Sequence, residues 1–224
     1  MSPASAPNLA PEGRDKPSLP SHELPLLRAT AENLQGFGAL ISDPDGCEIE
    51  IVRWPAQGWR AVDPGTGDQG GTTEGIFEFR WDGPTLRAHN TSVGGQNQYV
   101  LGWSCDPQAV DTQTAAAPTR ERVLLWHANY HPDGGQLFYP RAPGAFVAPL
   151  ALPGDDVTPD DFLAFWFDGS RGLYIHPGVW HEAVFPVTDR QPFFDKQGKV
   201  HARVSVDFGA EFGCYLSAPL PQRL

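Results

Sequence analysis

Hydrophobic and polar residues alternate along much of this chain, with the period of two that is typical of β-strands with one buried face. The runs that suit strands are residues 48–53, 75–81, 99–103, 122–127 and 162–167. The most regular stripe is formed by Val200, Ala202, Val204, Val206 and Phe208. Gly and Pro separate the runs, and only Thr30–Leu34 and Thr158–Phe162 indicate short helices. The pattern predicts an all-β fold, either an antiparallel barrel or a sandwich.

The two ends of the chain differ in composition. Residues 1–22 are rich in Pro, Ser and Ala and have few large apolar side chains, so they cannot bury enough surface to offset the entropy lost on ordering. We expect this segment to be a disordered tail and residues 23–224 to form a single domain, which is long enough for a sizeable core. The Gly- and Thr-rich stretch 64–75 is predicted to be a loop.

Charge and cysteine usage narrow the function classes. The net charge is -11 and no basic patch is evident, so neither nucleic acid nor an anionic membrane is an expected partner. No apolar run reaches 18 residues, and the first residues contain no signal-like apolar segment. Cys47, Cys105 and Cys214 form neither a metal-binding pair nor an even disulfide set, which favours reduced thiols and a cytoplasmic location.

The first chemically suggestive segment is His131-Pro-Asp-Gly-Gly-Gln136. Pro and Gly favour a chain reversal, so His131 and Gln136 are predicted to flank a four-residue hairpin loop. Directly opposed residues of a hairpin have Cβ atoms about 4.5–5.5 Å apart, a spacing that suits two ligands of one metal ion. The alternative, to which we give equal weight, is that both residues merely cap a hairpin in solvent.

The second segment is His176-Pro-Gly-Val-Trp-His181, in which Pro177 and Gly178 reverse the chain between two histidines. Imidazoles held at one turn can bind a metal through a neutral nitrogen, or act as general acid and base near pH 7. In the alternative interpretation His176 is an exposed turn residue and Trp180 is a core aromatic. Because two such turns occur in one β-rich chain, we favour a functional role for at least one of these histidines.

These segments resemble the two motifs of cupins, and more closely the signatures of ureidoglycolate lyase, also called ureidoglycolate hydrolase. His131-Pro-Asp-Gly-Gly-Gln136 followed by Phe138, Tyr139 and Pro140 is similar to the family's His-Pro-x-Gly-x-Gln-x-Phe-x-Pro signature. Residues 175–181 resemble its Tyr-His-x-x-Val-Trp-His stretch, and Asp207, Gly209 and Cys214 resemble a later pattern. The chain departs from the family at 103–107, where Trp-Ser-Cys-Asp-Pro stands in place of an Arg before a Pro.

The resemblance implies a cupin-like antiparallel β-barrel (jelly roll) with few short helices, a homodimer, and cleavage of (S)-ureidoglycolate to glyoxylate and urea. It suggests His131, Gln136 and His181 as ligands of a divalent metal, with Zn, Ni, Mn and Fe not distinguishable. We further expect His176 and Asp207 to handle protons and Arg80, Tyr139 and Trp180 to contact a small carboxylate substrate; a solvated Asp207 is the alternative. Other functions left open are an isomerase, dioxygenase or lyase acting on another small acid, and a carboxylate sensor without catalysis.

Overall fold

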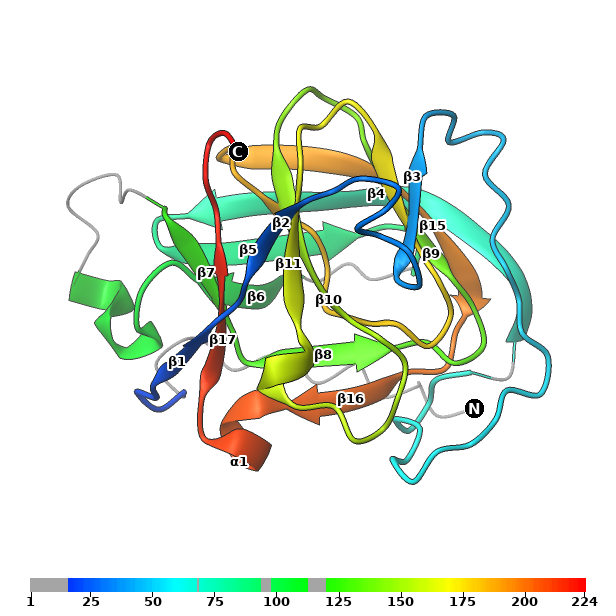
Figure 1. Cartoon of the computed structure of the whole chain (residues 1–224), viewed down its shortest axis with the longest axis horizontal. Coiled ribbons are helices and arrows are strands. Elements are labelled where there is room, and N and C mark those ends of the chain that lie inside the picture. Colours follow the sequence, from blue (N-terminus) through cyan, green and yellow to red (C-terminus); the bar gives the residue numbers. More distant parts are fainter. Residues whose placement is uncertain (1–15, 68, 94–97, 113–119) are drawn as a thin grey trace.

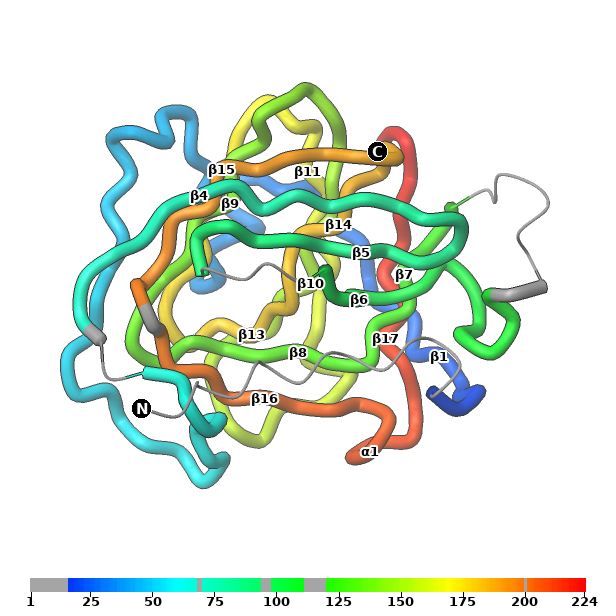
Figure 2. Tube along the Cα trace, turned by 180° about the vertical axis from the view of Figure 1, so that it is seen from behind, coloured from blue at the N-terminus to red at the C-terminus, as the bar shows by residue number. Residues whose placement is uncertain are grey.

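The computed structural model describes residues 16–67, 69–93, 98–112 and 120–224. Two β-sheets face each other and enclose most of the core, as Figures 1 and 2 show from opposite sides. The prediction of an all-β chain with few short helices is confirmed, and the described strands form two separate sheets. In the described part of the chain, no helix is long and apolar enough to cross a membrane.

The larger sheet contains the long strands of the molecule. Its order is β1 (Ser21–Glu23), β17 (Tyr215–Pro219), β7 (Arg122–Leu125), β6 (Tyr99–Trp103), β5 (Thr85–Asn90), β4 (Gln69–Asp82), β15 (Arg190–Val200), β9 (Gln136–Pro140), β12 (Gly172–Ile175) and β3 (Gly38–Ile41). Its pairs are antiparallel except for β1, which runs parallel to β17 at one edge.

The smaller sheet has the order β16 (Val204–Asp207), β8 (His127–Tyr130), β13 (Trp180–His181), β10 (Phe146–Ala151), β11 (Leu163–Phe167) and β2 (Leu26–Arg28). A further short strand, β14 (Phe185–Pro186), pairs with β10. Helical structure among the described residues is confined to the 3₁₀ turns η2 (Pro107–Thr112) and η3 (Pro159–Asp161) and to helix α1 (Phe208–Phe212), which follows β16.

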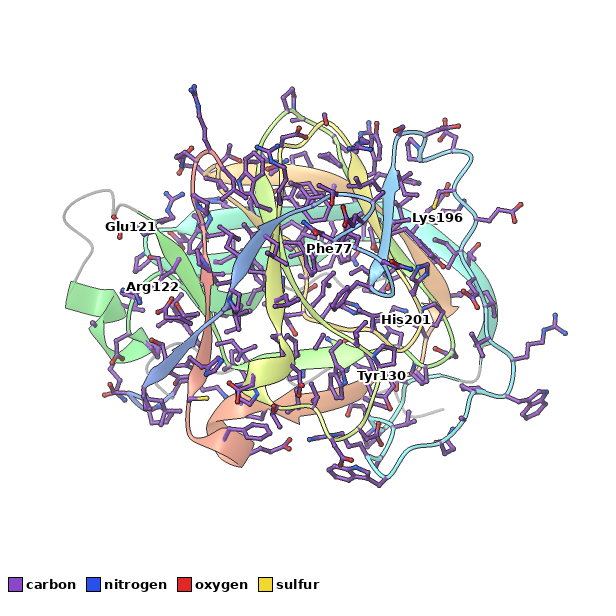
Figure 3. All side chains as sticks on the ribbon, viewed as in Figure 1. Phe77, Glu121, Arg122, Tyr130, Lys196 and His201 are labelled. Carbon is purple, nitrogen blue, oxygen red and sulfur yellow. The ribbon has the colours of Figure 1, made fainter. Side chains whose placement is uncertain are left out.

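Aromatic side chains join the inner faces of the two sheets. Phe193 of β15 meets Phe79 of β4 edge to face at 5.5 Å and Phe146 of β10 edge to face at 5.1 Å. Phe77 lies near the centre of the molecule in Figure 3. Each fully buried aromatic of this size contributes about 1.5–3 kcal/mol relative to an exposed position, so this cluster fixes the spacing of the sheets.

Several predicted boundaries need correction. Residues 16–22, placed in the tail by their composition, belong to the fold: β1 pairs with β17, and the Lys16 ammonium lies 3.5 Å from Asp207 and 3.7 Å from the Trp126 ring centre. Backbone pairing and a single cation hold this segment, so its apolar content was a poor guide. The rest of the predicted tail, residues 1–15, lies outside the described residues.

Three local predictions had mixed outcomes. The predicted loop 64–75 is wrong from residue 69 onward, because Gly and Thr there extend β4 alongside β15. Residues 48–53 make one isolated bridge, at Ile51, instead of a strand. Thr30 caps its segment as expected, since its Oγ1 accepts from the Asn33 N–H at 3.1 Å, although the segment forms turns and not a regular helix.

Candidate active site

A cluster of polar side chains lies in the interior between the two sheets. His181 of β13 and His131, just after β8, come from the smaller sheet, and Gln136 of β9 and Asp195 of β15 come from the larger sheet. The exposed fractions are 2% for His181, 6% for His131, 5% for Gln136 and 0% for Asp195. Polar groups buried this deeply cost free energy unless they are paired, so their partners define what the cluster can do.

Backbone carbonyls fix the proton positions of the two histidines. Nδ1 of His131 lies 2.9 Å from the Ala202 oxygen, and Nδ1 of His181 lies 2.8 Å from the Val179 oxygen. A carbonyl only accepts, so each Nδ1 carries the hydrogen and each neutral ring keeps a lone pair on Nε2. Burial lowers the pKa of both histidines, that of His131 well below its ordinary value, so both are neutral at pH 7.

The Gln136 amide bridges the histidines and a buried carboxylate. Its Nε2 donates to Asp195 Oδ1 at 2.7 Å, and its Oε1 lies 3.3 Å from His181 Nε2. Asp195 Oδ2 accepts from Asn90 Nδ2 at 2.9 Å, from Gln197 Nε2 at 2.7 Å and from the Ser92 hydroxyl. Burial raises the pKa of Asp195, and the donated hydrogen bonds oppose that shift.

A third histidine completes the cluster. The His201 ring stacks on that of His131 with centroids 3.3 Å apart, and the His131 and His181 rings meet edge to face at 5.1 Å. Burial lowers the pKa of His201 to about 3. Its Nδ1 is buried and has no hydrogen-bond partner among the described atoms. Figure 3 shows His201 beside Tyr130, at the end of β8.

A second polar group lies further along the same face of β8. His127 Nδ1 is 2.6 Å from Glu182 Oε2, and Asn129 Nδ2 is 3.4 Å from the same oxygen. The Asn129 Oδ1 atom is buried and has no partner among the described atoms. Burial and the nearby Glu182 and Asp195 carboxylates raise the pKa of Tyr99 well above its ordinary value, so its hydroxyl is protonated.

The predicted hairpin between His131 and Gln136 is wrong. β8 pairs with β13 and β16, whereas β9 pairs with β12 and β15, so the loop 132–135 crosses from one sheet to the other. The two side chains nevertheless belong to one cluster, because His181 contacts both. The second turn supports the first directly: the N–H of Gly178, whose φ is +81°, donates to the His131 oxygen at 2.9 Å.

His176 and Tyr139 occupy the opposite face of the larger sheet. The His176 ring contacts Tyr174 at 5.5 Å, and Tyr139 packs with Tyr174 in a small outer hydrophobic cluster and donates to the Ser42 oxygen at 3.2 Å. The alternation along β9 points Gln136 inward and Tyr139 outward. The structure therefore does not bring either residue to the buried histidines.

Trp180, Arg80 and Asp207 also lie apart from the histidine cluster. Trp180 is fully buried on the other face of β13, packs edge to face on Tyr130 and donates to the Gly154 oxygen at 2.8 Å. Arg80 is exposed and lines a surface pocket of about 340 Å³. Asp207 caps helix α1 by accepting from the Ala210 N–H at 3.0 Å, and also binds Lys16.

Comparison with known proteins agrees with this arrangement. The ureidoglycolate lyase family matches residues 22–203, a span that contains His131, Gln136, His181 and His201. The chain belongs to the ureidoglycolate lyase family. It is 30% identical over 129 residues to a ureidoglycolate lyase of Stutzerimonas stutzeri, covering 56% of this chain and 72% of that protein. It is 35% identical over 83 residues to ureidoglycolate lyases of Pseudomonas paraeruginosa and Pseudomonas aeruginosa, covering 36% of this chain and 47% of those proteins.

The motif interpretation of this ureidoglycolate lyase family member missed half of the cluster. Asp195 and Gln197 were hidden within an alternating strand in which Gln191, Phe193, Asp195 and Gln197 all face inward. That repeated placement of polar residues at inward positions was an available signal. His201 lies in the break between β15 and β16, where alternation gives no direction.

Whether the cluster suits a metal depends on its donor atoms. Among the described residues, no group of three or more His, Cys, Asp or Glu side chains is placed to hold a metal ion. The candidate set reaches three donors when the amide oxygen of Gln136 joins the Nε2 atoms of His131 and His181. Metal-bound histidines commonly donate their other ring N–H to a carbonyl, and both of these histidines do so. The residues therefore fit a divalent metal with nitrogen and oxygen ligands.

Proposed function

We propose that this chain is a lyase that cleaves (S)-ureidoglycolate to glyoxylate and urea, with a divalent metal held by His131, Gln136 and His181. The observation that carries the proposal is the pair of buried, neutral histidines whose Nε2 lone pairs are left free by backbone carbonyls. Family membership and the names of the relatives supply the substrate.

The reaction requires two proton movements and no oxidant or reductant. The carbinol O–H of the substrate loses its proton, its electron pair forms the aldehyde C=O, the C–N bond breaks, and the leaving nitrogen takes up a proton to become urea. A bound divalent metal would stabilise the negative charge that develops on the carbinol oxygen. The chain's own groups must hold the substrate carboxylate and carry the protons.

Arg203 is the positive residue best placed to hold the carboxylate. Its charge acts on His131, His201 and Tyr99, and its Nε donates to Asp63 Oδ2 at 2.6 Å, which anchors the side chain. An anchored guanidinium can bind a carboxylate with directed hydrogen bonds. In this proposal Arg203 takes the role that the sequence suggested for Arg80.

The proton carriers in this proposal are His201 and the pair of His127 and Glu182. His201 is neutral, contacts His131 and has an unpartnered ring nitrogen, so it is placed to accept the carbinol proton. His127 and Glu182 share a short hydrogen bond of 2.6 Å beside the unpartnered Asn129 oxygen. Asn129 would accept an N–H of the ureido group, and the adjacent pair would supply the proton to the leaving nitrogen.

The test is incubation of the full chain with (S)-ureidoglycolate while glyoxylate and urea are both measured. Chelator-treated protein is assayed alone and with Zn, Ni, Mn or Fe, and the (R) enantiomer and protein-free buffer serve as controls. We expect equal amounts of the two products from the (S) substrate, faster than its own decay. The Arg203→Gln variant should raise KM more than it lowers kcat. Decay at the protein-free rate with every metal would contradict the proposal and favour another small carboxylic acid.

A further inference from the structure

Asp195 is a fully buried carboxylate to which the proposed reaction gives no task. Four side chains donate to it: Gln136 to Oδ1, and Asn90, Gln197 and Ser92 to Oδ2. Such a group has no route to substrate through its own oxygens, since each already accepts from the protein. Its effect must therefore pass through the residues that it orients, and the residue on its Oδ1 side is Gln136.

One end of this hydrogen-bond chain is fixed by the backbone. The Ser92 N–H donates to Asn90 Oδ1 at 2.9 Å, and a backbone N–H can only donate. The Asn90 amide is therefore locked, with its Nδ2 facing Asp195 Oδ2. Gln197 Nε2 also donates to this oxygen, at 2.7 Å. The Oδ2 position of residue 195 consequently has to be an acceptor.

The other end is fixed by a backbone carbonyl. Because the Val179 oxygen accepts from His181 Nδ1, the His181 Nε2 atom carries a lone pair. Gln136 Oε1, also an acceptor, lies 3.3 Å from it. Two acceptors thus face each other, and the polarity of the chain is consistent everywhere except at this gap. Such a gap suits a cation that both lone pairs can bind.

We propose that Asp195 is a positioning residue, which holds the Gln136 amide with Oε1 toward His181 Nε2 and thereby creates the metal-binding gap between them. An aspartate is suited to this because it accepts on both oxygens, from Asn90 on one side and from Gln136 on the other. The inference rests on the proposed function only for the identity of the cation as a metal.

The Asp195→Asn substitution tests the polarity argument. The asparagine oxygen must take the Oδ2 position, because Asn90 donates there, so its NH₂ faces Gln136. The Gln136 amide then turns over, accepts from this NH₂ through Oε1 and donates through Nε2 to His181. All hydrogen bonds of the chain are satisfied, and the gap is lost. We expect the affinity for Ni²⁺ or Co²⁺, measured by calorimetry on chelator-treated protein, to fall about 10- to 100-fold, with little change in Tm.

A second substitution should restore binding. In the double variant Asp195→Asn, Gln136→Glu, one glutamate oxygen accepts from the asparagine NH₂ and the other faces His181, so metal affinity should return at least to the wild-type value. Gln136→Glu alone places a carboxylate beside Asp195, across a contact that is 2.7 Å in the wild type, and should bind more weakly than the double variant. Asp160→Asn, at a side chain that is 89% exposed, is the control for removing a carboxylate.

Nitrogen NMR of the metal-free protein separates this inference from the metal role. In the wild type His181 Nε2 should be unprotonated without a donor, and in Asp195→Asn it should accept a hydrogen bond from the Gln136 amide. If the spectra show this change but the wild type binds no metal, the metal role fails and the positioning role of Asp195 stands. Unchanged metal affinity in Asp195→Asn, or a doubly protonated His181 in the metal-free wild type, would overturn the proposal.

Discussion

The two motif segments place neighbouring residues on opposite faces of the same strands, and the two faces do different work. On the inner face of β9 and β13, Gln136 and His181 belong to the buried polar cluster. On the outer face of the same strands, Tyr139 binds the Ser42 oxygen and Trp180 binds the Gly154 oxygen. A contiguous motif thus combines residues suited to chemistry with residues that fasten the strands to the covering loops.

The largest expected effect separates the histidines at the two ends of the second turn. His181→Ala should lower kcat for ureidoglycolate cleavage by about 100-fold or more, because it removes one of three proposed metal donors. His176→Ala should leave kcat within about twofold, because its ring contacts Tyr174 on the outer face. Steady-state kinetics and elemental analysis of bound metal on both purified variants check this.

Thermal unfolding is the control, since it shows that both variants are folded when assayed. A His176→Ala variant with wild-type Tm and metal content but strongly reduced kcat would break the comparison, and would return the proton-transfer role to the turn. Equal activity of the wild type and His181→Ala would remove the inner cluster from catalysis.

The fold was predictable because alternation reports burial directly. The stripe from Ala202 to Phe208 is buried, and the runs 75–81, 99–103 and 162–167 lie in or largely within strands. His131, Gln136 and His181 were also identified together, although the predicted reason, a hairpin, was wrong. A short Pro- and Gly-rich loop fits both a hairpin and a crossover between sheets, and the residues inside the loop do not distinguish them.

The remaining site residues could not be assigned because their roles depend on contacts distant in sequence. Asp195 meets Asn90 and Ser92 across more than 100 residues, and it matters only because β4 and β15 are paired. Arg80 and Arg203 are equally plausible carboxylate ligands by charge alone. Only the sheet packing shows that Arg80 is exposed and that Arg203 acts on the buried histidines.

A smaller effect is expected on the pH dependence of stability. Burial lowers the pKa of His131, His181 and His201 in the folded protein, so below about pH 6.5 the unfolded chain binds protons that the folded chain does not. The free energy of unfolding should therefore fall on acidification, by up to about 1.4 kcal/mol per pH unit for each histidine. The raised pKa of Asp195 acts in the opposite direction, because the folded chain takes up that proton first.

Denaturant unfolding of the metal-free wild type and the His201→Gln variant between pH 7 and 5 checks this sign. The variant should lose stability less steeply, since it lacks one of the three buried neutral histidines. Identical slopes would mean that His201 titrates alike in the folded and unfolded chains and is not buried as the structure places it.

The smallest effect sharpens the comparison at Asp207, whose contacts are those of a cap. Asp207→Ala removes the side chain that accepts from Ala210 N–H and binds Lys16, and should cost about 1 kcal/mol of stability. Asp207→Asn keeps the cap and loses only the charge, so it should cost less. Both variants should retain wild-type kcat. If kcat falls in both while Tm is unchanged, Asp207 acts on the reaction, because a cap whose loss leaves stability intact cannot explain the change in rate.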